Sequence, residues 1–299
     1  MRDLPELHRH LDGSLRRETL RELADEAGVR LPDWDIRFFD GMGLAAALAR
    51  FEVTLSVLQR PDAVRRVAAE ICEDAVREGV GCLEIRFAPQ LHRGGAIADI
   101  VDAALDGIHG RAGLILCVLY GESPGLADQL VELARHRPGV VGLDLAGGPS
   151  PAHAHSMASY APAFERARAL GIGRTVHAGE GRPPAEIRTA IETLHAQRIG
   201  HACTLLQDEG IVRLALDRGI TIEACPTSNV QTGAVPSLRE HPLVDWLKRG
   251  LSATVCCDNT LLSDVDAPLE WQRAAAMPGM TPELMDQARA AGFAARFRR

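Results

Sequence analysis

The chain has 299 residues, 46% of them hydrophobic and 4% aromatic, a composition that predicts a globular protein with an extensive aliphatic core. Its net charge of −7 at pH 7 gives no electrostatic reason to expect a nucleic-acid partner. The seven cysteines are scattered and odd in number, which argues against a disulfide framework. Without an apolar leader or a continuous apolar stretch of about 20 residues, we expect a cytoplasmic protein with no membrane association.

Eight short apolar segments, each followed by a polar or glycine-rich junction and then a helical pattern, predict eight β/α units. The predicted strands span residues 4–10, 81–87, 114–119, 140–145, 173–177, 198–201, 221–224 and 253–257. This alternation predicts an α/β fold, a single (β/α)8 TIM-type barrel that takes in residues 1–299 as one domain. The functional sites of such barrels lie at the carboxyl ends of the strands and in the loops that follow.

The clearest predicted helix spans residues 61–78, where apolar side chains recur at intervals of three and four. Pro61 and Asp62 suit its first turn. The longest segment without a predicted strand, residues 30–59, follows the first strand and carries an apolar stripe of its own. We predict a helical insertion there, which either packs against the core or covers the substrate as a lid.

His8 and His10 occur on the first predicted strand, in the sequence LHRHLDG. Because side chains alternate along a strand, both imidazoles point to the same side and can bind one ion. An isolated His-x-His pair is more often a solvated polar strand end. Its assignment as half of a metal site therefore depends on the residues downstream.

Polar residues, with one glycine, lie at or just beyond the ends of most of the other predicted strands. They are Arg86, Asp144 with Gly147, His177 with Glu180, His201, Glu223 and Asp258. Histidine and carboxylate ligands suit a divalent ion such as Zn2+, with iron, manganese or cobalt as alternatives. Taken singly, Glu180 could be a first-turn helix carboxylate, His201 a buried structural histidine and Asp258 a turn residue. Their recurrence at independent strand ends favours one shared hydrolytic site.

Seven motifs occur in order along almost the whole chain. They are HRHLDG at 8–13, EIRFAPQ at 84–90, DLAG at 144–147, HAGE at 177–180, RIGHA at 198–202, CPTSN at 225–229 and DN at 258–259. With these motifs the chain resembles the adenosine deaminase family of the amidohydrolase superfamily. The resemblance implies a zinc-dependent aminohydrolase that converts adenosine or 2′-deoxyadenosine to inosine or 2′-deoxyinosine and ammonia, with no redox or group-carrier cofactor.

The resemblance also implies a role for each residue of the site. The implied metal ligands are His8, His10, His177 and Asp258, and the implied substrate-binding residues are His10, Asp12, Gly147 and Asn259. Glu180 would protonate the purine nitrogen N1, so that C6 becomes electrophilic toward a water activated by zinc. His201 would orient and deprotonate that water. Asp12 would hydrogen-bond the ribose, the Gly147 backbone would meet the purine edge, and Asn259 would contact N7.

The chain departs from the family pattern at three places. Asn259 stands where a second aspartate is common, but an amide can still donate a hydrogen bond to a purine acceptor. Gly148 and Pro149 stand where an acidic pair is common, so we expect a reshaped loop. The chain also ends soon after Asp258, so we expect trimmed terminal helices.

Asp12 favours a small-molecule substrate that carries a ribose, because relatives that act on free adenine tend to have glutamate at this position. The alternative to adenosine is 6-amino-6-deoxyfutalosine, a compound of menaquinone biosynthesis with a bulky group at the sugar 5′ end.

Two hypotheses come from other classes of protein. A different zinc hydrolase on the same barrel would usually need a bridging lysine or a second metal cluster, and no lysine lies near a predicted strand end. A catalytically silent metal- or nucleoside-binding barrel would be expected to lack Glu180 or a ligand, and none is missing. The sequence does not specify the oligomeric state.

Overall fold

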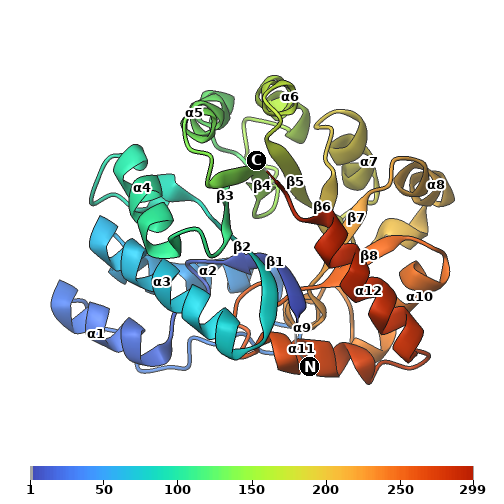
Figure 1. Cartoon of the computed structure of the whole chain (residues 1–299), viewed down its shortest axis with the longest axis horizontal. Helices are drawn as coiled ribbons and strands as arrows, with labels where there is room; N and C mark the ends of the chain where they lie inside the picture. Colours follow the sequence, from blue (N-terminus) through green and yellow to red (C-terminus); the bar gives the residue numbers. More distant parts are fainter. Residues whose placement is uncertain (1–2, 299) are drawn as a thin grey trace.

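The computed structural model describes residues 3–298. Eight parallel strands form one sheet that is curled into a barrel (Figure 1). Its strands are β1 (Leu4–His10), β2 (Val80–Phe87), β3 (Gly113–Leu119), β4 (Val140–Ala146), β5 (Gly173–Ala178), β6 (Arg198–His201), β7 (Thr221–Ala224) and β8 (Ser252–Val255). They pair in sequence order, and a bridge between Arg9 and Asp258 joins the two sheet edges. The predicted (β/α)8 fold is confirmed, and the predicted strand ends lie within two residues of the observed ones.

Helices surround the strands, as Figure 1 shows. They are α1 (Arg17–Ala27), α2 (Leu44–Val57), α3 (Pro61–Arg77), α4 (Ile97–Ile108), α5 (Pro124–Arg135), α6 (Ala161–Ala169), α7 (Ala185–Glu192), α8 (Glu209–Asp217), α9 (Pro226–Gln231), α10 (Leu243–Lys248), α11 (Ala267–Ala275) and α12 (Pro282–Ala295). The helix predicted at residues 61–78 is α3, which begins at Pro61 and buries one apolar face. In the described part of the chain, no helix has both the length and the apolar character needed to cross a membrane.

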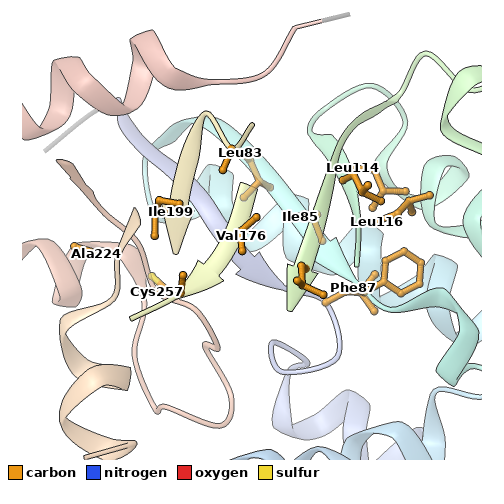
Figure 2. Packing of buried hydrophobic residues seen from close by; sticks show 14 of the residues in the cluster. Leu83, Ile85, Phe87, Leu114, Leu116, Val176, Ile199, Ala224 and Cys257 are labelled. Atoms are coloured by element: carbon orange, nitrogen blue, oxygen red, sulfur yellow. The ribbon is translucent and has the colours of Figure 1, made fainter. Parts of the chain in front are cut away.

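The main apolar core lies between the strands and the surrounding helices. On β2, Leu83, Ile85 and Phe87 alternate with Glu84 and Arg86, as expected for a strand whose two faces have different environments. Figure 2 shows the first three packed with apolar side chains of neighbouring strands. Burial of these apolar side chains stabilises the fold by roughly 1.5–3 kcal/mol for each one.

The inside of the barrel, by contrast, is ionic. Arg86 pairs with Asp144 and Glu223 at 2.8 and 2.7 Å, and Arg198 pairs with Glu223 and Glu84 at 2.7 and 2.6 Å. All five side chains are buried. Isolated charges in such a place would be very costly, but each charge here faces an opposite one. These pairs link β2, β4, β6 and β7 through the inside of the barrel.

The predicted insertion at residues 30–59 contains one helix, α2, after an irregular segment. Gly41 and Gly43 have φ angles of 72° and 91°. These angles are incompatible with a right-handed helix, so α2 cannot extend further toward the amino terminus than Leu44. Phe51 of α2 packs against Phe38, and the two ring centroids are 6.3 Å apart. The helix lies next to the carboxyl end of β1, as the contact between the Phe51 and His10 rings shows.

Candidate active site

Four of the predicted site residues bring their ligand atoms together at the carboxyl ends of the strands. The Nε2 atom of His10 lies 3.3 Å from Nε2 of His8 and 3.2 Å from Nε2 of His177. Oδ1 of Asp258 lies 3.6 Å from Nε2 of His8 and 3.4 Å from Nε2 of His10. These residues come from β1, from β5 and from the residues just after β8, so that the closed barrel assembles the cluster.

The spacing of these atoms fits a tetrahedral metal ion. A zinc ion with ligands at about 2.05 Å has ligand atoms roughly 3.3 Å apart. Burial lowers the pKa of His8 and of His10 well below the usual value, so both rings are neutral, as metal ligands must be. Burial raises the pKa of Asp258 to about 7, and a cation beside it would favour the carboxylate. The residues present therefore suit zinc.

The second nitrogen of two ligand imidazoles faces a carboxylate. Nδ1 of His8 lies 2.6 Å from Oε2 of Glu223, and Nδ1 of His177 lies 3.1 Å from Oδ2 of Asp144. When each ring donates its Nδ1 proton to the facing carboxylate, Nε2 is left with a lone pair that can bind a metal. Lone pairs that converge on one point are the donor arrangement that a metal ion requires.

Arg86 holds both of these carboxylates, and its own Nη2 also donates to the carbonyl oxygen of Leu7 at 2.6 Å. Burial opposes ionisation of Asp144, but the adjacent His177 and Arg86 lower its pKa below the usual value. Asp258 is held separately, since the hydroxyl of Ser228 donates to its Oδ2 at 2.6 Å. Hydrogen bonds therefore orient His8, His177 and Asp258, three of the four predicted ligands.

Glu180 and His201 lie beside this cluster. The Glu180 side chain is buried, its Oε1 accepts a hydrogen bond from the Thr232 hydroxyl at 2.8 Å, and its Oε2 lies 3.7 Å from Nε2 of His201. The preceding residue must be glycine, because a Cβ on Gly179 would lie 2.6 Å from the Ile187 side chain. A carboxyl group with one oxygen held and the other directed at the site can deliver a proton to a bound molecule.

Two site residues have a left-handed backbone. His201 and Asp258 have φ angles of 70° and 65°, an uncommon conformation for residues with a side chain. Such conformations cost of order 1–3 kcal/mol each and are concentrated at functional sites. Here the turn directs each side chain inward at the end of its strand.

Asp12, Gly147 and Asn259 also come to the same region. Oδ1 of Asp12 and Oδ1 of Asn259 are buried, and neither accepts a hydrogen bond within the described residues. Burial raises the pKa of Asp12 to about 7. Gly147 has a φ of 76° and lines the space between them and the metal ligands. Buried polar atoms without a partner are expected where a ligand supplies one.

Two adjoining cavities open at these residues. A small one, about 50 Å³, borders Glu180, His201 and Asn259, and a larger one, about 300 Å³, borders Asp12. Leu48 and Phe51 of α2 line both. The insertion thus contributes an apolar wall to the site, while Phe38 and Ala47 of the same segment pack in a small apolar cluster with Leu262.

The sequence prediction assigned no role to several residues that complete the site. Arg86, Asp144 and Glu223 were placed at strand ends, but their function as holders of the ligands depends on pairings across the barrel. The others are Ser228, Asn229, Thr232 and His241. The signal that could have found two of them is the CPTSN motif, which contains Ser228 and Asn229.

Fold and site define a (β/α)8 barrel of the amidohydrolase type, with three histidines and an aspartate that could hold a metal ion at the carboxyl ends of its strands. Residues 4–297 match the model of the family described as adenosine deaminase, and the chain belongs to that family.

Relatives and solved structures agree with this assignment. The chain is 37% identical over 289 residues to a probable adenosine deaminase of Dictyostelium discoideum, covering 90% of this chain but only 37% of that longer protein. It is 36% identical over 285 residues to an adenosine deaminase of Vibrio vulnificus, covering 88% and 85% of the two chains.

The structure is similar to an adenine deaminase of Arthrobacter aurescens, with a TM-score of 0.88, 25% identity and coverage of 100% and 95%. It is equally similar to the Arabidopsis N6-mAMP deaminase, with a TM-score of 0.88, 26% identity and coverage of 99% and 94%. These neighbours act on different purines, so the family does not by itself define the substrate.

Proposed function

We propose that this protein removes the 6-amino group of adenosine or 2′-deoxyadenosine by hydrolysis in the cytoplasm, using one zinc ion. The observation that carries the proposal is the position of Glu180, a buried carboxyl group whose free oxygen faces His201 beside the four ligand side chains. The reaction forms a C6–O bond, breaks the C6–N bond and releases ammonia.

In the proposed reaction His8, His10, His177 and Asp258 hold zinc, which supplies an activated water at neutral pH. Glu180 delivers a proton to N1 of the purine, so that C6 accepts the oxygen nucleophile. Thr232 keeps one oxygen of Glu180 engaged and leaves the other for N1. Asn259 and Gly147 border the space for the purine, and Asp12 borders the space for the ribose.

The lining of the larger cavity supports a nucleoside rather than a nucleotide. Its charged lining residues are the carboxylates Asp12 and Glu52, and none of its described lining residues is lysine or arginine. Arg182 lies behind Gly148, where its Nε pairs with Glu186 at 2.7 Å and its buried Nη1 has no hydrogen-bond partner among the described residues. A 5′-phosphate in this cavity would meet two acidic side chains, and the one guanidinium behind the wall is already shared with Glu186.

The same cavity favours one second candidate, 6-amino-6-deoxyfutalosine. Beyond Asp12 its walls are mostly apolar, with Leu55, Leu91 and Leu119 among them. At about 300 Å³ the cavity has room for a substituent on the sugar 5′ carbon. The bulky 5′ group of this substrate would occupy that space.

The test is ammonia release by purified protein of measured zinc content, from adenosine, 2′-deoxyadenosine, adenine, AMP and 6-amino-6-deoxyfutalosine. We expect kcat/KM for adenosine to exceed that for AMP at least about 100-fold, which corresponds to roughly 3 kcal/mol. A higher kcat/KM for 6-amino-6-deoxyfutalosine would select the second candidate. A preference for AMP would contradict the nucleoside assignment, and no turnover of any of the five would contradict the deaminase proposal.

A further inference from the structure

A line of buried hydrogen bonds runs outward from His201. Its Nδ1 lies 2.9 Å from the side-chain nitrogen of Asn229, whose oxygen Oδ1 lies 3.2 Å from Nε2 of His241. Nδ1 of His241 in turn lies 3.2 Å from the backbone nitrogen of Leu243, at the start of α10. The three side chains are 1%, 0% and 5% exposed, so water does not compete for these contacts.

The direction of donation along this line of hydrogen bonds is fixed at His241, the member farthest from His201. A backbone N–H can only donate, so Nδ1 of His241 accepts from Leu243. Burial lowers the pKa of His241 to about 3, which keeps the ring neutral with its single proton on Nε2. That proton is donated to Oδ1 of Asn229, and the amide group of Asn229 therefore turns its NH2 toward His201.

We propose that Asn229 and His241 are positioning residues that hold His201 with a bare Nδ1 and with its proton on Nε2. The proposal rests on the proposed deaminase function for its catalytic meaning. Nε2 of His201 is the atom that faces Glu180 at 3.7 Å, beside the ligand cluster. The ring therefore presents an N–H donor to the oxygen that attacks C6 and orients that oxygen.

Asparagine is suited to this position because it carries a donor and an acceptor on one short planar group. Aspartate has the same shape but accepts at both oxygens. At residue 229 it would accept from Nδ1 of His201 and so reverse the tautomer of that ring. Asn229→Asp therefore changes the direction of the line with little change in volume.

The experiment is 15N NMR of the zinc-loaded protein with labelled histidine, in which the nitrogen chemical shifts distinguish protonated from bare ring nitrogens. The chain has 11 histidines, and the His201 signals are assigned by their loss in His201→Asn. We expect a bare Nδ1 and a protonated Nε2 in the natural protein, and a protonated Nδ1 in Asn229→Asp. A protonated Nδ1 in the natural protein, or an unchanged spectrum in Asn229→Asp, would overturn the proposal.

Steady-state kinetics of the variants test the positioning role independently of the NMR spectra. In Asn229→Asp and in His241→Phe we expect kcat for adenosine to fall at least about tenfold, with KM and zinc content nearly unchanged. The matched control is His92→Gln, because His92 is also buried and bonded to the backbone, at Leu58, but lies outside this line. Equal losses of kcat in the control and in His241→Phe would show a merely structural role.

These results separate the two proposals. If no purine is deaminated, the proposed function fails, but the NMR spectra still decide whether Asn229 and His241 set the tautomer. If adenosine is deaminated and the tautomer is the opposite one, the positioning proposal fails while the function remains. If Asn229→Asp does not fold, His241→Phe provides the same test, since it removes the donor to Asn229 and should give His201 a mixture of tautomers.

Discussion

The Glu223 carboxylate accepts the Nδ1 proton of His8 across 2.6 Å, from a strand 215 residues further along the chain, and both side chains are fully buried. Glu223 also accepts from Arg86 at 2.7 Å and from the Thr175 hydroxyl at 2.9 Å. Because several donors fix this carboxylate, it fixes the tautomer and direction of His8. The metal site therefore depends on a residue that is not itself a ligand.

A substitution at Glu223 tests whether its hydrogen bond to His8 supports the metal site. Glu223→Gln should weaken zinc binding about 10- to 100-fold, because the amide holds His8 less firmly and no longer neutralises Arg86. Competition with a chromophoric chelator measures the zinc dissociation constant. Glu165→Gln, an exposed change on α6, is the control. A dissociation constant within twofold of the natural protein would contradict this role, and thermal unfolding without zinc detects any general loss of fold.

Removal of zinc should lower the midpoint of thermal unfolding. An ion that binds only the folded chain stabilises it by RT ln(1 + [L]/Kd), about 4 kcal/mol at 1,000 times Kd. We expect the midpoint to fall in excess chelator and to recover when zinc is added back. In His177→Ala, which lacks one ligand, the midpoint should not respond to zinc; a response of natural size would remove His177 from the ligand set.

Glu180→Gln should abolish most of the turnover while zinc stays bound. General acid catalysis contributes about 10²–10⁴-fold, and an amide cannot supply the proton to N1. Ammonia release and metal analysis on the same sample measure the two effects. Thr232→Val, which removes only the hydrogen bond to Glu180, should have a smaller effect of roughly 5- to 10-fold on kcat. Full activity in Glu180→Gln would exclude this residue as the acid.

Glu270, which is not part of the predicted metal site, should make the free energy of unfolding depend on pH. Burial raises its pKa from 4.5 to about 7, although the Thr227 backbone N–H donates to it at 2.7 Å. The folded chain therefore binds the proton more tightly than the unfolded chain, and the stability falls as the pH rises from about 4.5 to 7.

In Glu270→Gln this loss should disappear, because the amide carries no charge to bury. Urea unfolding at pH 5 and pH 8 should give the natural protein a decrease of about 2–4 kcal/mol from this residue. The variant should lack that part of the decrease, and an equal decrease in both proteins would contradict the assignment. Glu192→Gln, on the surface helix α7, is the control for a charge change alone.

Gly13→Ala should displace Asn259 without disturbing the metal. A Cβ on Gly13 would lie 1.8 Å from Oδ1 of Asn259, so the amide must move out of the small cavity. We expect KM for adenosine to rise about tenfold, with zinc content unchanged, because one good hydrogen bond to the purine is lost. Gly125→Ala, where a Cβ meets only the Ser123 hydroxyl at 3.5 Å, should leave KM as it is.

The barrel and the ligand residues could be predicted because both depend on local patterns. Apolar strands followed by helices define the fold, and strand alternation alone puts His8 and His10 on one face. The topology of a parallel barrel then brings strand ends together, whatever their distance along the chain. That is why His177 and Asp258 could be placed in the site before any contact was known.

The supporting contacts could not be predicted in the same way. Asn229 lies on the six-residue helix α9, and His241 lies on the segment before α10, so no periodic pattern brings either one to His201. Glu223 and Arg86 were visible at strand ends, but the sequence does not state which donor meets which carboxylate. The insertion was predicted as helical, and only α2 is, because Gly41 and Gly43 interrupt the segment before it.

The barrel is sealed at the same residue that offers a ligand. The backbone of Asp258 accepts from the amide of His10 at 2.8 Å and donates to the carbonyl of His8 at 2.9 Å, which joins the first and last edges of the sheet. An ion held by the side chains of His8, His10 and Asp258 would also strengthen this junction between β1 and the residues after β8. The exchange rate of the His10 and Asp258 amide hydrogens with deuterium therefore serves as an internal gauge of metal occupancy, slow when the ion is bound and faster when it is removed.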